Sequence, residues 1–352
     1  MADYKLNITE FLARSIDLPV IDVRSPAEFD HGHVPGSINL PLFTNEERSI
    51  VGTLYLQKGS SEAMMKGLEI IGPKMKEFAA LALSIAPGGE SLLHCWRGGM
   101  RSNSMAWLLN TVGIKTHTLE GGYKSYRSFA LACFAKPLNL VVIGGMTGSG
   151  KTEVLETLES LGKQVIHLEK LAMHKGSVFG SIGMPSQPTT EQFENNLFTR
   201  LKQLNTDEPV YIEDESLAIG RVFIPQPFYE QMSSARFLNL VVPLNRRVQQ
   251  LVTAYTGGDK ESLVNGVKHI DKRLGLENAA NAIDCIYNGD MKKAVEIVLR
   301  YYDKIYARSM GLHRRKESRE ILVNNEDASE IANKIISVTN HQAPKYNIQN
   351  SQ

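Results

Sequence analysis

The stretch that decides the fold reads Gly145-Met146-Thr147-Gly148-Ser149-Gly150-Lys151-Thr152. It follows the apolar run 138–143 and precedes a helical pattern, which is the strand, loop and helix context of a phosphate-binding P-loop. Glycines let the backbone turn so that successive N–H groups face one phosphate, and Lys151 adds a positive charge. The Thr152 hydroxyl is placed for Mg²⁺. The pattern therefore assigns to phosphate binding Gly145, Gly148, Ser149, Gly150, Lys151 and Thr152.

Residues beyond this loop alternate between strand and helix patterns. The helix after the loop is predicted from one apolar face, with Gly162 as its stop; that face comprises Val154, Leu155, Leu158 and Leu161. Further strands are expected at 164–169, 209–216, 237–242 and 321–323, and a helix at about 328–338. This alternation predicts an α/β fold with a mainly parallel sheet and its ligand at the carboxyl ends of the strands. The glycine- and proline-rich segment 174–188 is expected to form a loop over the phosphate site.

Acidic residues end the strand expected at 209–216. P-loop proteins place at such a strand end a carboxylate that holds Mg²⁺ or orients water. Asp214 is the candidate, and Glu213 is the alternative because the sequence does not fix the register. Acidic side chains that are merely solvated at a strand end are the other interpretation.

The length and composition of the chain are those of an ordinary protein that is long enough to form more than one hydrophobic core. At roughly 150 residues per domain, 352 residues correspond to about two domains. No apolar run approaches the roughly 18 residues that span a bilayer, and the N-terminus lacks a signal-peptide pattern, so we expect a cytoplasmic protein with no membrane contact. The net charge of +1 gives no general attraction to a polyanion, so any nucleic-acid surface must be local. Three widely spaced cysteines argue against both disulfides and a cysteine-rich metal site, and we expect no bound structural metal.

A second informative run spans residues 91–102 and reads Ser-Leu-Leu-His-Cys-Trp-Arg-Gly-Gly-Met-Arg-Ser. A short strand delivers Cys95 to a glycine-containing loop, and a helix opens at Arg101. Loop N–H groups and the positive end of that helix favour the thiolate, which lowers the pKa of Cys95 and makes it a nucleophile. Arg101 and Arg97 are candidates to hold an anionic oxygen of a substrate. The alternative is a buried, inert cysteine, which is how Cys133 and Cys285 are interpreted.

Residues 22–29, Asp-Val-Arg-Ser-Pro-Ala-Glu-Phe, and 32–41, Gly-His-Val-Pro-Gly-Ser-Ile-Asn-Leu-Pro, resemble the N-terminal signature of the rhodanese family of sulfurtransferases. A later run, Glu120-Gly121-Gly122-Tyr123, resembles the turn that closes beside the active loop in that family. The resemblance implies a rhodanese-like α/β domain over residues 1–135 with a catalytic cysteine loop. Asp22 and Arg24 are expected to form a framework ion pair, and His31 and His33 to be structural histidines.

The cysteine loop departs from this family in one respect. Rhodanese active loops are commonly shorter, whereas residues 95–101 have the form Cys, five residues, Arg that is shared with protein phosphatases. The loop is therefore expected to accept a phosphate-like group. Pro137 marks the junction with a P-loop domain over residues 136–340, followed by a disordered tail at 341–352. With so short a junction, we expect the two domains to pack together and both loops to serve one reaction.

Basic side chains cluster in the second half of the chain at 246–247, 268–273 and 313–319. Each cluster taken singly is typical of a solvated face. Together with Tyr301, Tyr302 and Tyr306, they are also compatible with a surface that follows an RNA backbone.

Both domains in this order, with residues 95–102, 144–152, 212–216 and 253–257, resemble the bacterial tRNA 2-selenouridine synthase family over about 19–310. The resemblance implies a transferase that replaces the sulfur of 2-thiouridine at the wobble position of the tRNA anticodon with selenium. Selenophosphate is the implied selenium donor, and geranyl diphosphate is the implied donor of a geranyl group to that sulfur. The P-loop would hold the diphosphate, and Cys95 would either take selenium as a perselenide or expel the S-geranyl group.

Two other classes of function stay open. One is a cysteine-dependent phosphatase or sulfurtransferase fused to a small-molecule kinase. The other is a non-catalytic nucleotide-sensing module in which Cys95 is only a structural or redox thiol.

Overall fold

The computed structural model describes residues 4–177, 179–180, 182–255, 259–310 and 317–340. The chain divides into two compact units, one of residues 1–134 with 191–199 and one of residues 135–190 with 200–352. Residues 191–199, which the sequence places in the P-loop domain, thus lie in the first unit. The tail 341–352, the basic run 313–316 and residues Thr256 and Gly257 lie outside the described residues.

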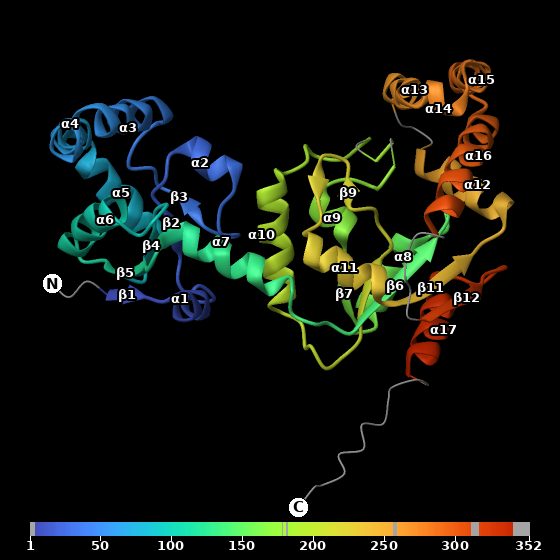
Figure 1. Cartoon of the computed structure of the whole chain (residues 1–352), viewed down its shortest axis with the longest axis horizontal. Helices are drawn as coiled ribbons and strands as arrows, with labels where there is room; N and C mark the ends of the chain where they lie inside the picture. Colours follow the sequence, from blue (N-terminus) through green and yellow to red (C-terminus); the bar gives the residue numbers. More distant parts are fainter. Residues whose placement is uncertain (1–3, 178, 181, 256–258, 311–316, 341–352) are drawn as a thin grey trace, which may run out of the picture. The chain divides into compact units, whose positions relative to one another are not determined.

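The first unit is built on a parallel sheet with strand order β1-β5-β4-β2-β3 (Figure 1). Its strands are β1 (Tyr4–Leu6), β2 (Val20–Asp22), β3 (Ile38–Asn39), β4 (Glu90–His94) and β5 (Lys115–Leu119). Its helices are α1 (Ile8–Arg14), α2 (Pro26–His31), α3 (Asn45–Lys58), α4 (Ser60–Ile71), η1 (Gly72–Lys74), α5 (Met75–Ile85), α6 (Met100–Thr111) and α7 (Gly122–Cys133). The α/β class predicted for this domain is confirmed, and its strands are all parallel.

Local sequence explains how helix α2 begins and where the cysteine loop lies in this unit. Helix α2 begins with Pro26 at its first position, and the Glu28 carboxylate accepts the Ser25 N–H at 3.0 Å, which closes a capping box. Strands β2 and β4 are neighbours with Asp22 opposite His94, so both strands end at the same edge of the sheet. The cysteine loop therefore begins at a central strand, where the carboxyl ends of parallel strands place ligands.

The second unit is built on another parallel sheet, with strand order β12-β11-β6-β8-β7 and a separate β9-β10 hairpin. Its strands are β6 (Leu140–Gly145), β7 (Gln164–Ile166), β8 (Val210–Glu213), β9 (Ala218–Ile219), β10 (Val222–Phe223), β11 (Arg236–Val241) and β12 (Glu317–Leu322). Its helices include α8 (Lys151–Ser160), α9 (Leu168–Ala172), α11 (Gln226–Ser234), α12 (Leu244–Tyr255), α13 (Lys260–His269), α14 (Asp271–Leu274), α15 (Leu276–Tyr287), α16 (Met291–Met310) and α17 (Ala328–Asn340). Helix α10 (Thr190–Leu201) contributes residues 191–199 to the first unit.

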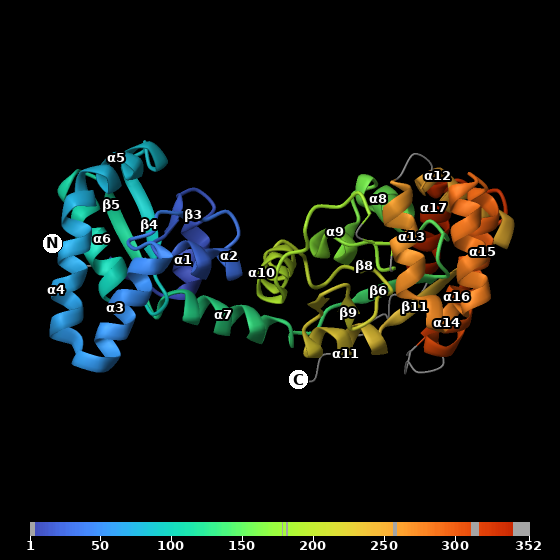
Figure 2. The ribbon, with the colours of Figure 1, turned by 90° about the horizontal axis from the view of Figure 1, so that it is seen from above.

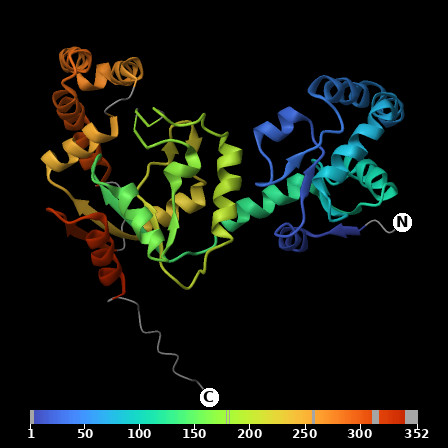
Figure 3. The ribbon, with the colours of Figure 1, turned by 180° about the vertical axis from the view of Figure 1, so that it is seen from behind.

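Helices α8 and α17 cover one face of this sheet. Their buried side chains, Leu155 and Ile335 among them, pack with β6 and β11 in one apolar cluster. Figure 3 shows β12 and α17 at one edge of the unit, in red. Leu161, predicted on the apolar face of α8, is instead 46% exposed because the helix ends at Ser160 and Leu161 is its C-cap. The predicted stop is confirmed, since Gly162 follows with φ +74°.

Helices α13 to α16 gather beside the sheet, as Figure 2 shows from above. They bury a separate apolar cluster that includes Val264, Ala282 and Val298. The sequence analysis noted basic and tyrosine side chains in this region and did not predict this cluster. Among the described residues, no helix combines the length and apolar character that crossing a bilayer requires.

Candidate active sites

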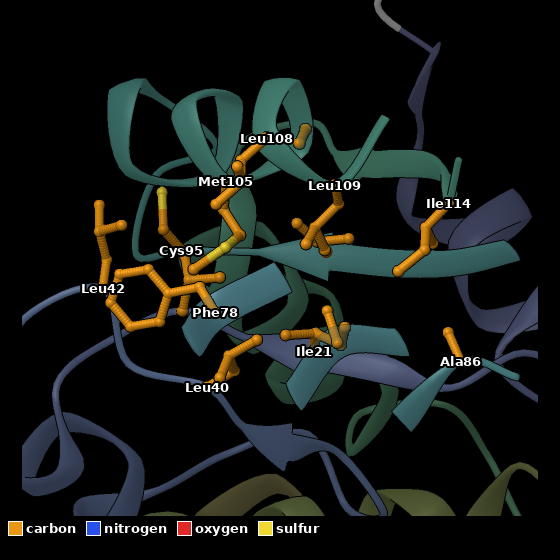
Figure 4. Packing of buried hydrophobic residues seen from close by; sticks show 14 of the residues in the cluster. Ile21, Leu40, Leu42, Phe78, Ala86, Cys95, Met105, Leu108, Leu109 and Ile114 are labelled. Carbon is orange, nitrogen blue, oxygen red and sulfur yellow. The ribbon is translucent and has the colours of Figure 1, made fainter. Parts of the chain in front are cut away.

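Cys95 directly follows β4 and is 3% exposed, with Phe78, Leu42 and Met105 among its apolar neighbours (Figure 4). Its Sγ lies 3.4 Å from Ser102 Oγ, and the Gly99 N–H donates to Sγ at the same distance. Helix α6 begins at Met100, so its positive end faces the loop as predicted. The sequence analysis gave Ser102 no role, although it stands one helical turn from the loop glycines.

Opposing influences set the pKa of Cys95. Burial is the largest and raises the pKa, because a thiolate loses hydration in an apolar setting. Hydrogen bonds from the Ser102 side chain and from the backbone N–H groups of Gly99, Ser102 and Arg97 act in the opposite direction and prevail. The pKa of Cys95 therefore lies below its ordinary value, as the sequence predicted for a nucleophilic thiol.

The turn at residues 120–123 closes against the cysteine loop through the backbone. Tyr123 N–H donates to Cys95 O at 2.8 Å, and Lys124 N–H donates to Trp96 O at 3.0 Å. Gly122 has φ +61°, and a Cβ there would lie 2.4 Å from both Cys95 O and Gly98 N. Only glycine fits this contact, which confirms the predicted position of the turn beside the loop.

Arg101 already holds a carboxylate in this structure. Its Nη1 donates to Glu28 Oε2 at 2.6 Å and its Nη2 to Glu28 Oε1 at 3.2 Å, as in a bidentate pair. Burial raises the pKa of Glu28, but the hydrogen bond and charge of Arg101 outweigh it, and the pKa is lowered. Arg97 is exposed on the loop. The role of either arginine toward a substrate stays a prediction, and Glu28 is a partner that sequence reasoning missed.

Framework contacts surround the loop. The Arg24 guanidinium pairs with Asp22 at 2.6 Å, with both side chains buried, and its Cζ lies 3.8 Å from the Tyr123 ring centre. The predicted ion pair is thus confirmed. His33 stacks on Phe29 and shares a hydrogen bond of 2.9 Å with its carbonyl oxygen, which fits a structural histidine.

The phosphate loop connects β6 to α8, as predicted. Its glycines have positive φ, +152° at Gly145, +80° at Gly148 and +78° at Gly150. A Cβ would meet Ser149 Oγ at 2.4 Å from Gly145 and Arg247 O at 2.9 Å from Gly148, so side chains are excluded for packing reasons as well. Lys151 Nζ donates to Gly145 O at 2.8 Å.

Two residues from distant helices support this loop. Gly145 N–H donates to Tyr306 Oη at 2.7 Å, and Tyr306 donates in turn to Asp214 Oδ2 at 3.5 Å. Arg247, only 4% exposed, donates to Thr147 O at 3.2 Å and forms a bidentate pair with Asp303 at 2.9 and 2.8 Å. Arg247, grouped with the basic clusters in the sequence analysis, is therefore neither on a solvated face nor available to an RNA backbone, because it is buried and paired with Asp303. Tyr306 lines the phosphate cleft, and a contact of Tyr306 with RNA stays a prediction. Sequence spacing gave no signal for these contacts.

Basic side chains elsewhere divide between exposed and tethered positions. Lys268, Lys272 and Arg273 are exposed on α13 and α14. Arg246 donates to Asn324 O and Glu326 O. Among the basic residues that the structure describes, this exposed group on α13 and α14 has the form expected of a solvated or RNA-facing surface, and Arg319 is exposed and paired with Glu317.

Carboxylates converge at the end of β8. Burial, followed by the charge of Glu169, raises the pKa of Glu213 to about 7, although the backbone N–H of Glu169 donates to its Oε1 at 2.8 Å. Burial and the same neighbouring charge raise the pKa of Glu215 well above its ordinary value. Asp214, the predicted carboxylate, is half-buried beside the phosphate loop. The buried position belongs to Glu213, the alternative that the sequence left open.

Oxygen atoms suited to Mg²⁺ are present at this site. Thr152 Oγ1 donates to Glu169 Oε2 at 3.2 Å, and Asp214 lines the same cavity. Mg²⁺ prefers carboxylate and hydroxyl oxygens together with phosphate, so these residues fit the ion. Within the described residues, no group of three or more His, Cys, Asp or Glu side chains is arranged to hold a metal ion by itself. Thr152 and Asp214 remain the residues that would hold Mg²⁺ together with a phosphate.

A cleft of about 1060 Å³ opens over the phosphate loop. The P-loop forms its floor, and the acidic residues Glu169, Asp214 and Glu215 line one part of it. Lys175, Gly176 and Ser177 also line the cleft, as expected for the loop predicted at 174–188. Its remaining wall is formed by α11, α12 and α16, and its apolar part comprises side chains of α12 and α16, including Leu251, Tyr255, Tyr302 and Ile305.

Comparison with known proteins identifies relatives of both parts. Residues 138–341 match the family described as tRNA 2-selenouridine synthase AAA domain, and residues 7–129 match the rhodanese-like domain, which confirms that prediction. A Nitrosomonas eutropha protein named tRNA 2-selenouridine synthase is 40% identical over 247 residues, covering 68% of this chain and 63% of that protein. Proteins of the same name from Nitrosomonas europaea and Shewanella sediminis are 38% and 33% identical, covering 68% and 88% of this chain and 64% and 92% of theirs. The chain thus spans a little under two thirds of the two Nitrosomonas proteins.

Proposed function

Because the chain belongs to the tRNA 2-selenouridine synthase family, we propose that it is a transferase that converts 2-thiouridine at the wobble position of tRNA to 2-selenouridine. The observation that carries this proposal is a thiol of lowered pKa and a complete P-loop in one chain of this family. Its substrates would be the anticodon region of tRNA, selenophosphate as the selenium donor, and geranyl diphosphate.

The first step makes the sulfur a leaving group. The sulfur of 2-thiouridine attacks C1 of geranyl diphosphate, a C–S bond forms, the C–O bond breaks, and diphosphate leaves with the electron pair while the N3 proton of the base is released to solvent. The P-loop N–H groups and Lys151 would hold the diphosphate and stabilise the charge that develops on it. Mg²⁺, if held by Thr152 and Asp214, would supply further neutralisation of the diphosphate.

The second step replaces the S-geranyl group with selenium, and electron balance separates the two roles considered for Cys95. Selenium in selenophosphate is fully reduced, so a Cys95 perselenide requires an oxidant that none of the proposed substrates supplies. Displacement is redox-neutral: the Cys95 thiolate attacks C2 of the base and geranyl thiolate leaves. The selenium atom of selenophosphate then attacks C2 and displaces the Cys95 thiolate, and water cleaves the P–Se bond and releases phosphate. The lowered pKa of Cys95 suits it both to attack and to leave.

Mass spectrometry of tRNA nucleosides tests both steps with the purified protein, thiolated tRNA, geranyl diphosphate and selenophosphate. We expect Lys151→Ala to slow S-geranylation by about 100-fold. Cys95→Ser should accumulate S-geranyl-2-thiouridine and form 2-selenouridine at least roughly 100-fold more slowly. The matched control is Cys133→Ser, which changes a half-buried cysteine outside the loop. Normal geranylation by Lys151→Ala would remove the P-loop from the first step, and normal selenation by Cys95→Ser would remove the thiol from the second.

The long form of the cysteine loop favours one other candidate, a cysteine-dependent phosphatase joined to a small-molecule kinase. That function requires Arg101 to bind phosphate, whereas Arg101 is paired with Glu28. Release of phosphate from p-nitrophenyl phosphate that depends on Cys95 would support the phosphatase. Its absence, together with selenation of tRNA, would exclude it.

A further inference from the structure

We propose that the apolar cavity behind the P-loop, between α12, α13, α15 and α16, binds the isoprenoid chain of a prenyl diphosphate. This inference rests on the proposed function, in which the P-loop holds the diphosphate of that molecule. It adds the position of the chain and the residues that set its length.

The cavity is apolar on nearly every side. Its lining side chains come from four helices and the loop before α10, and they are Phe179, Leu251, Tyr255, Leu263, Val267, Ile286, Met291, Ala294, Val295, Val298, Leu299 and Tyr302, with Thr147 and Ser177 at its mouth. Most of these side chains are buried, and charged groups are absent from the lining given by the described residues. Such a lining favours a hydrocarbon and disfavours a nucleobase, a ribose or a second phosphate.

The cavity and the phosphate cleft share a boundary. Thr147, Ser177, Leu251, Tyr255 and Tyr302 line both of them. Thr147 belongs to the P-loop itself, and a Cβ on Gly148 would lie 3.0 Å from Leu251 Cδ1, so Leu251 packs directly on the loop backbone. An anionic group on the loop N–H groups is thus adjacent to an apolar surface. A prenyl diphosphate likewise joins an anionic diphosphate group directly to an apolar hydrocarbon chain.

The cavity is too small to hold a geranyl chain unless some of its lining side chains move. It measures about 40 Å³, which is room for a few water molecules and too small for a geranyl chain. The cleft side of the same wall, with Ala254 and Ile305, offers room for the first carbons. The remainder of the chain enters as Met291 and Leu251 change rotamer, which unbranched methionine does readily. Chain binding therefore deepens an existing apolar cavity.

Ala294 provides the sharpest test because its small side chain lines the cavity and lies on α16, away from the P-loop residues. Ala294→Met fills the cavity. We expect it to weaken binding of geranyl diphosphate about tenfold, which corresponds to roughly two methylenes left unburied, and to leave binding of inorganic diphosphate unchanged. The matched control is Ala280→Met, at an exposed position on α15.

Leu263→Ala is the complementary variant, because it enlarges the same cavity. We expect it to shift the affinity ratio of farnesyl to geranyl diphosphate about tenfold toward the longer chain. This variant keeps the inference testable if the larger methionine prevents folding, which circular dichroism would show.

Isothermal titration of the full-length protein with inorganic, geranyl and farnesyl diphosphate separates the outcomes. Support requires geranyl diphosphate to bind more tightly than inorganic diphosphate, with that difference lost in Ala294→Met and shifted in Leu263→Ala. Equal affinity for both ligands, or a folded Ala294→Met with an unchanged ratio, overturns the apolar site while the P-loop keeps its proposed role. Failure of every diphosphate to bind overturns the proposed role of the P-loop and this inference with it.

Discussion

The sulfur of Cys95 is stabilised as a thiolate by hydrogen-bond donors that the loop and the start of α6 bring to it. Gly99 contributes a backbone N–H, and the turn that brings it over Sγ includes Gly98, whose φ of +63° favours glycine. Ser102 contributes a hydroxyl because it is buried in the first turn of the helix. The order of these residues along the chain is sufficient to produce the arrangement, which is why a local motif predicted it.

Removing one donor should shift this ionisation measurably. Ser102→Ala takes away the side chain that is the largest of the influences lowering the pKa of Cys95, so the pKa should rise toward its ordinary value. The pH midpoint of alkylation by iodoacetamide, measured in a Cys133→Ala, Cys285→Ala background, should move upward. Ser104→Ala, at an exposed position on the same helix, is the control and should leave the midpoint unchanged.

The same shift links Cys95 to stability. A pKa that is lowered in the folded state contributes stability at pH values above the unfolded pKa, and that contribution is lost as the pH falls through the folded pKa. Ser102→Ala should therefore lose more stability at alkaline than at neutral pH. Equal losses at both pH values would show that Ser102 acts only by packing.

Helices α12 and α16 act together as a support for the P-loop. Arg247 on α12 and Asp303 on α16 form a bidentate pair, and the guanidinium also holds Thr147 O of the loop. Tyr306, one turn after Asp303, accepts the Gly145 N–H. The position of the loop thus depends on two helices that follow it by about a hundred residues or more in the sequence.

Arg247→Met should disturb both the helix pair and the loop. It leaves Asp303 without its partner, and because Asp303 is partly exposed we expect a loss of about 2 kcal/mol, below the full effect for a buried pair. Binding of inorganic diphosphate should weaken as well. Chemical denaturation and titration calorimetry would measure the two effects. Arg300→Met, at an exposed site on α16, should change neither, and a stable Arg247→Met with normal binding would contradict this role.

At the scale of the whole molecule, the rhodanese-like unit depends on residues far from it in sequence. Asn195 is fully buried, and its Nδ2 donates to His33 O at 2.9 Å and to Tyr123 Oη at 2.8 Å. Its Oδ1 accepts from Arg127 Nη1 at 2.6 Å. This side chain thus joins three parts of the first unit, and a fragment that stops at residue 134 would lack it.

Asn195→Ala should destabilise the first unit selectively. It leaves buried polar groups of His33, Tyr123 and Arg127 with fewer partners, at a cost of about 3 kcal/mol. Hydrogen exchange followed by mass spectrometry should show faster exchange in β4 and β5, with β6 and β11 unchanged. Asn196→Ala is the neighbouring control, since that side chain is less buried. Uniformly faster exchange in both sheets would contradict the selective effect.

Sequence reasoning succeeded where chemistry is carried by consecutive residues. The P-loop glycines, the cysteine loop and the glycine turn at 121–122 each act through backbone geometry within a few positions, so residue type and spacing determine them. Strand and helix alternation likewise predicted the parallel sheet of the second unit. Glu28, Tyr306 and Arg247 were missed as partners of the two loops because their contacts depend on how distant elements pack.

The sequence by itself thus determined the α/β class, the two loops and the membership of the chain in its family, because each rests on local patterns. Only the tertiary structure decided that Arg101 forms an ion pair with Glu28, that Arg247 and Tyr306 hydrogen-bond to the P-loop, and that an apolar cavity adjoins the phosphate cleft. The physical reason is that these features are formed by side chains separated by tens to hundreds of residues. Their meeting is fixed by burial and hydrogen bonding across the fold, which no local pattern encodes.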